Sequence, residues 1–60
     1  MMNIIDLSVR DKVLYSPSPK EKEVALVKGF TFDGMVIIKT STDNIVDVEP
    51  SRIIKIIGKL

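Results

Sequence analysis

The chain has 60 residues, of which 45% are hydrophobic, and nine lysines and arginines against eight acids give a net charge of +1. A chain of this length forms one domain, which buries only about 60% of the surface that the unfolded chain exposes. Because it has no cysteine and no histidine, disulfide staples and a zinc-stapled fold are excluded. The near-neutral charge argues against nonspecific coating of nucleic acid.

The N-terminal segment, residues 1–10, is too short in its apolar part to be a signal peptide, and its charges come too early. No apolar run in the chain approaches the ~20 residues that span a bilayer. We therefore predict a cytoplasmic protein with no membrane partner. Ile4, Ile5 and Leu7 supply apolar side chains, so we expect this segment to pack on the folded domain.

Alternation of apolar residues predicts the first strand over Asp11–Tyr15, with Val13 and Tyr15 on one face. Residues 16–23, SPSPKEKE, follow as an exposed loop. Two prolines restrict φ there, and the four alternating charges bring no apolar residue to bury.

The next two strands are predicted over Val24–Phe32 and Met35–Thr40, joined by Asp33 and Gly34. Asp-Gly between two β-prone runs is typical of a two-residue type I′ turn, which needs positive φ at both central positions. The sequence therefore predicts a tight hairpin here.

The second strand has apolar residues on both faces. We predict that the face of Val24, Leu26, Phe30 and Phe32 is the interior, with the two phenylalanines as its main aromatic bulk. The alternative is that the two rings form a stacking platform for bases. On the other face Gly29 indicates a bulge or a sharp bend.

Short polar residues in TSTDN predict a second turn, in which Asn44 takes a left-handed conformation. A fourth strand follows over Ile45–Val48, and Pro50 ends it. EPSR has room for one 3₁₀ turn, after which a fifth strand begins over Ile53–Ile57. Turn signals at intervals of roughly eight to ten residues favour strands over helices.

This order of elements resembles the small SH3-like barrels, particularly the Tudor and KOW branches. VRDKVLY is similar to their opening strand, EVALVKGFTFDGMVIIK to their central hairpin, and DNIVDVEPSRIIKI to their closing strand, 3₁₀ turn and last strand. The resemblance implies an all-β fold, a five-stranded and strongly bent antiparallel barrel that binds without catalysis. KOW-type modules contact RNA, ribosomes or transcription complexes, and Tudor-type modules often hold methylated side chains in an aromatic cage, to which Tyr15 would contribute.

The run MVIIK, with the neighbouring apolar segments, places side chains on both strand faces, whereas a barrel has one interior. Exposed contiguous apolar surface usually marks an interface. We therefore predict that Met35, Val36 and Ile38 contact a protein partner. Tyr15 is expected at the barrel rim, where it would contact a ligand or partner, because its hydroxyl needs water or a partner.

Four bases are the candidate contacts to phosphate or to an acidic partner. They are Lys12, Arg52, Lys55 and Lys59. A solvated strand face explains them equally well.

No chemistry beyond binding is expected. The acids Asp43, Asp47 and Glu49 fit no calcium-binding loop, so no metal site is predicted. Without histidine or cysteine, and with little room for a pocket, we expect no enzyme, no cofactor and no small-molecule substrate.

We predict a small non-enzymatic interaction module that binds a protein partner, and a second copy of the chain in a homodimer is one such partner. A chain of this size is more often an accessory or regulatory protein, such as those that phages carry, than a metabolic component. The alternative is a KOW- or Tudor-like module that binds RNA or DNA in a ribosome or transcription complex.

Overall fold

A computed structural model describes residues 7–59 of the chain. The described chain is all-β, with five strands and one 3₁₀ turn in the predicted order. The elements are β1 (Asp11–Tyr15), β2 (Glu23–Phe30), β3 (Val36–Thr40), β4 (Ile45–Val48), η2 (Pro50–Arg52) and β5 (Ile53–Lys59). The first and fourth strands have the predicted bounds, the third and fifth differ by one or two residues at one end, and the second differs at both ends.

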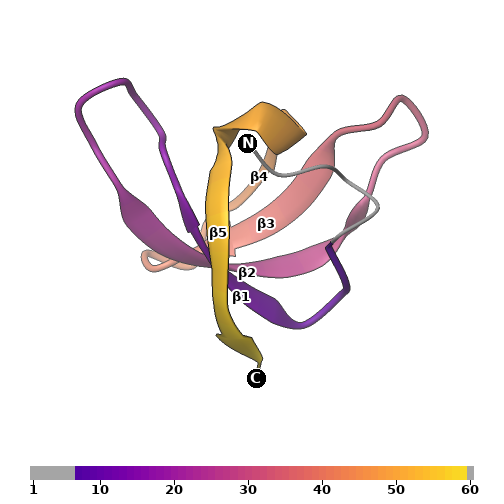
Figure 1. Ribbon diagram of the computed structural model, residues 1–60. Helices are drawn as coiled ribbons and strands as arrows, with labels where there is room; N and C mark the ends of the chain where they lie inside the picture. Colours follow the sequence, from indigo (N-terminus) through magenta and orange to yellow (C-terminus); the bar gives the residue numbers. More distant parts are fainter. Residues whose placement is uncertain (1–6, 60) are drawn as a thin grey trace.

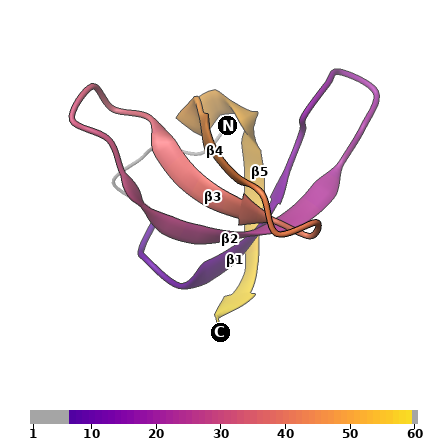
Figure 2. The same cartoon turned by 180° about the vertical axis from the view of Figure 1, so that it is seen from behind.

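All five strands form one antiparallel sheet in the order β4-β3-β2-β1-β5. Figures 1 and 2 show that the sheet is strongly bent, so that β5 runs steeply across the direction of β2 and β3. The turn η2 leads the chain from β4 into β5 (Figure 1). Because β4 and β5 stand at the two ends of the order and do not pair, hydrogen bonding does not close the sheet into a barrel.

The core lies against one face of the sheet, which we call the inner face; the opposite one is the outer face. Its core side chains are Leu7, Val13, Tyr15, Ala25, Val27, Val36, Ile38 and Ile53. Val27 is paired with Ile38 across β2 and β3, and both are fully buried. Apolar residues from four of the five strands therefore meet on this face.

The predicted interior of β2 is wrong. Ala25 and Val27 face inward, while Val24 is 37% exposed and Leu26 is half-buried on the outer face. Both faces of β2 are apolar, so the alternation alone did not identify the inner one. The inner face is filled mostly by small or β-branched side chains, with Leu7 and Tyr15 as the larger exceptions.

The phenylalanines are not the bulk of the core. Phe32 lies beyond the end of β2 and is 108% exposed, so its predicted burial is wrong. Phe30 pairs with Val36 at the margin of the inner face, where 38% of its surface remains exposed. The two rings do not share a strand, and a stacking platform on β2 is not formed. The expected bulge is present, because the β2–β3 register shifts between Val27 and Gly29.

The β2–β3 connection is longer than the predicted two-residue turn. Thr31 N donates to Met35 O (2.9 Å), and Gly34 N donates to Thr31 O (3.2 Å). Gly34 has a φ of +91°, whereas Asp33 is not among the residues with positive φ. The connection is therefore a three-residue hairpin loop, a turn followed by one left-handed residue.

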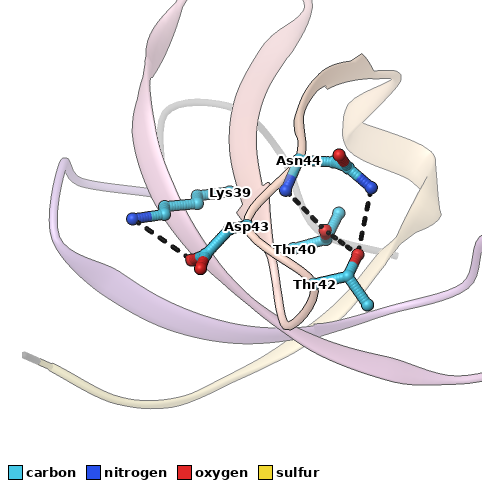
Figure 3. A network of polar contacts seen from close by, with 5 residues as sticks. All are labelled: Lys39, Thr40, Thr42, Asp43 and Asn44. Carbon is cyan, nitrogen blue, oxygen red and sulfur yellow. Dashed lines mark hydrogen bonds and ion pairs between the residues drawn. The ribbon is translucent and has the colours of Figure 1, made fainter.

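The β3–β4 connection is built in the same way. Thr40 N donates to Asn44 O (2.8 Å), and Asp43 N donates to Thr40 O (3.0 Å). The left-handed residue is Asp43, with a φ of +65°, and not Asn44 as predicted. Asn44 instead donates from its backbone to the Thr40 hydroxyl and from its side chain to the Thr42 hydroxyl (Figure 3). The polar groups of the turn are therefore hydrogen-bonded within the turn itself.

The start of the described chain is attached to the sheet. Leu7 is 6% exposed in the core, which confirms the expected packing for this residue, whereas Val9 is 49% exposed. Arg10 N donates to Val27 O (2.9 Å). Ile4 and Ile5 lie outside the described residues. Residues 16–22 of the predicted loop have no strand and are mostly exposed, whereas its last residue, Glu23, is the first of β2.

Candidate functional site

The outer face of the sheet carries a group of apolar side chains. Cross-strand partners share a face, and the register pairs Leu14 with Val24 and Gly29 with Ile37. The outer patch, as we name it, consists of Leu14, Val24, Leu26, Ile37 and Ile45. Val24 is 37% and Ile45 57% exposed, and the other three are half-buried.

Lysines border and divide the outer patch. Lys12 and Lys39 lie on either side of Leu26 across the sheet, and Lys55 is paired with Leu14. A hollow of about 360 Å³ opens between Lys12 and Lys39 over Leu26. Lys39 Nζ lies 3.4 Å from the carboxylate of Asp43 (Figure 3). One acidic side chain is thus already held at this border.

A second depression, of about 560 Å³, involves the end of β1, the loop after it, β4 and η2. Tyr15 lines it and is only 4% exposed. Burial raises the pKa of the Tyr15 phenol, and the carboxylates of Glu23 and Glu21 act in the same direction. Near neutral pH the phenol is therefore protonated and can donate a hydrogen bond.

The predicted protein contacts divide between the core and this depression. Val36 and Ile38 are fully buried, so the prediction that they contact a partner is wrong. They occupy the inward positions of a strand whose outward position, Ile37, belongs to the outer patch. Met35 is half-buried and lines the depression together with Tyr15. Those two residues remain candidate contacts.

The four predicted bases do not form one patch. Lys12 and Lys55 lie on the outer face, on the adjacent strands β1 and β5. Arg52 lies in η2, with Nη1 3.5 Å from Ser16 O and 3.4 Å from Pro17 O, and it lines the depression with Tyr15. Lys59 donates to the Asp11 carboxylate at 2.7 Å.

Asp11 is the one buried charged residue of the described chain, with 2% of its surface exposed. Its carboxylate accepts hydrogen bonds from Lys59 Nζ (2.7 Å) and from Ser8 N (2.8 Å). The Lys59 bond first, and then the Ser8 bond, hold the pKa of this carboxyl below its ordinary value, against the opposing effect of burial. The group ties the start of β1 to the end of β5 and is structural.

The outer patch was missed at the sequence level, although a signal for it exists. Side chains two residues apart in a strand point to the same face. Lys12 precedes Leu14 by two residues, and Lys28 follows Leu26 by two, so each lysine lies on the face of an outer-patch residue. A lysine on the same face of the strand as Val24 and Leu26 indicates that this face is exposed to water.

Within residues 7–59, no group of acidic side chains is placed to hold a metal ion. The same part of the chain has no helix that is long and apolar enough to cross a membrane. A scan against protein-family models finds no match, and searches of curated proteins and of solved structures find none. The likeness to Tudor and KOW domains stays an expectation from the order of elements, and the functional conclusion depends on geometry.

Proposed function

We propose that this protein is a non-enzymatic interaction module of SH3-like, Tudor- or KOW-like, architecture that binds a protein partner through its outer face. The observation that carries the proposal is the outer patch, where apolar side chains of four strands lie beside Lys12, Lys39 and Lys55. Contiguous exposed apolar surface usually marks an interface. The strand order and the 3₁₀ turn before β5 support the architectural class.

The border of lysines defines the chemistry of the partner. Lys12 and Lys39 flank the hollow over Leu26, and Asp43, which is paired with Lys39, also lines it, so a complementary segment carries an apolar side chain for Leu26 and a carboxylate for Lys12. The apolar contact supplies affinity, and the charges orient the partner and speed its approach. The ion pair between Lys39 and Asp43 is an internal example of such a carboxylate contact.

The positions of the aromatic rings favour protein over nucleic acid. Binding of single strands relies on base stacking against aromatic side chains. The three rings of the chain lie elsewhere: Tyr15 is in the core, Phe30 at the margin of the inner face and Phe32 in the β2–β3 loop. Binding of RNA or DNA is the alternative result that an affinity-capture experiment would detect.

The test is affinity capture from the cells that express the protein, comparing wild type with Leu26→Glu. The new carboxylate lies between Lys12 and Lys39, and such opposite-charge neighbours contribute roughly 0.2–1 kcal/mol, so the variant folds. It loses the central apolar contact and repels an acidic partner. We expect the captured partner to fall about tenfold or more, which corresponds to ~1.4 kcal/mol.

The matched control is Val9→Glu, which places the same acid at an apolar residue that is 49% exposed and precedes the sheet. It should capture the partner as wild type does. Equal capture by Leu26→Glu would contradict the proposal. Recovery of RNA or DNA, with binding that falls steeply between low and moderate salt, would establish the nucleic-acid alternative instead.

A further inference from the structure

The two edges of the sheet both present apolar side chains. Within residues 7–59, β4 pairs only with β3 and β5 pairs only with β1, so each has one edge without a strand beside it. On β4, Ile45 is 57% and Val46 37% exposed; on β5, Ile54 and Ile56 are 38% and Ile57 43% exposed. An edge with free backbone groups and exposed apolar residues is a template for pairing with another chain.

The two edges carry opposite charge. β4 and the residue after it hold Asp47 and Glu49 and no base, whereas β5 holds Lys55 and Lys59 and no acid. Asp47 is paired with the outward Ile37, and Lys55 with the outward Leu14. Both therefore lie on the outer face. Charged segments that adjoin in the sequence are thus separated to opposite ends of the sheet.

This separation decides how copies of the chain can meet. A two-fold contact pairs like edges, so it gathers lysines at β5 or acids at β4, and like charges placed opposite each other are destabilising. A head-to-tail contact, β5 of one copy beside β4 of the next, brings Lys55 to an edge that carries Asp47 and Glu49, while Lys59 stays paired with Asp11 of its own chain. Only the head-to-tail arrangement brings edges of opposite charge together.

We propose that the chain assembles head to tail, with β5 of each copy adding to β4 of the next to form a continuous sheet. Backbone hydrogen bonds and the apolar edge residues hold the contact, while the charges select the opposite edge over the like one. A contact between unlike edges closes into a ring or continues as a filament, and it does not stop at a dimer. It shares Ile45 and Lys55 with the outer patch and its border, but it leaves Leu26 and the hollow between Lys12 and Lys39 uncovered, so the two proposals can be tested separately.

The test uses two charge-swap variants of the full chain. In one, Asp47→Lys and Glu49→Lys make both edges basic; in the other, Lys55→Glu makes both acidic, and Lys59 is kept because it binds Asp11. Molar mass is measured by light scattering over a dilution series. We expect wild type to rise with concentration to multiples of the monomer mass, each variant alone to stay monomeric, and an equimolar mixture to assemble again.

Recovery on mixing also shows that both variants fold. Leu26→Glu, which alters only the outer patch, should assemble as wild type does, so this test and the capture experiment can fail separately. A wild-type mass equal to the monomer at all concentrations would overturn the proposal, and the edge lysines would then serve to keep chains apart. A dimer unaffected by either variant, or no recovery on mixing, would overturn it as well.

Discussion

Asp11 shows how one residue connects the two ends of the described chain. Its carboxylate lies at the start of β1, is 2% exposed, and binds both Ser8 N and the Lys59 side chain at the end of β5. Its pKa is lower in the folded chain than the ordinary value of 3.8. Its contribution to stability is therefore present above the unfolded pKa and is lost as the pH falls through the folded pKa.

Asp11→Asn is expected to lower the free energy of unfolding at neutral pH, because Lys59 then loses its anionic partner. The difference from wild type should shrink below about pH 4, where the wild-type carboxyl becomes protonated. Urea unfolding across a pH series measures both. Asp33→Asn, at an exposed hairpin residue, is the control and should follow wild type throughout. A constant difference for Asp11→Asn down to about pH 2 would contradict the assignment.

Residue positions were predictable where one face of a strand is clearly apolar. Val13 and Tyr15 of β1 lie on the side opposite to Lys12, and their predicted common face is buried. In β2 both parities are apolar, and the larger side chains were assigned to the interior. The volume that a bent sheet encloses depends on all its strands together, so apolar alternation within one strand does not show which set of side chains fits it, and Lys28, on the side of Val24 and Leu26, was the available indication in β2.

At the scale of elements, the two hairpins share one construction. Each begins with a threonine, Thr31 or Thr40, whose hydroxyl accepts a hydrogen bond from the backbone N–H four residues on. Each has its left-handed residue three positions after the threonine, at Gly34 or Asp43. Glycine adopts this conformation freely, and aspartate is among the few other residues that tolerate it.

Gly34→Ala should lower the free energy of unfolding by about 1–2 kcal/mol, the cost of a left-handed residue that has a Cβ. At Gly34 the added Cβ meets nothing within 4 Å, so the backbone conformation alone causes the loss. Gly58→Ala is the matched control, because its Cβ also meets nothing but φ is not positive. It should stabilise by roughly 0.4–1 kcal/mol. Chemical unfolding of both variants gives the comparison, and equal effects would contradict the turn assignment.

The sequence predicted the positions of the strands more accurately than the conformations of the turns. Strand positions came from alternation and from Pro50, and β1 and β4 have the predicted bounds. Asp33-Gly34 correctly marked a hairpin, but its type depends on where β2 ends. β2 ends at Phe30, and the bond from Thr31 N to Met35 O closes a loop of three residues, 32–34, rather than two. The outer patch was not predictable from any single strand, since it is assembled by the register of four.

For the whole molecule, one bent sheet separates three surfaces. The inner face is filled by the core, the outer face holds the outer patch and its lysines, and the two edges carry opposite charge. The proposed binding surface depends on which side of β2 faces inward. If Val24 and Leu26 were core, no outer patch would exist.

Threonine substitutions at two neighbouring β2 residues test this directly by urea unfolding. Threonine suits strands, so the strand propensity is kept. Val27→Thr buries a hydroxyl at a fully buried position and should cost about 1–3 kcal/mol. Leu26→Thr, at a half-buried position on the outer face, should cost less than about 1 kcal/mol. The reverse order, with Leu26→Thr the more destabilising, would contradict the assignment of the two faces and the proposed binding surface with it.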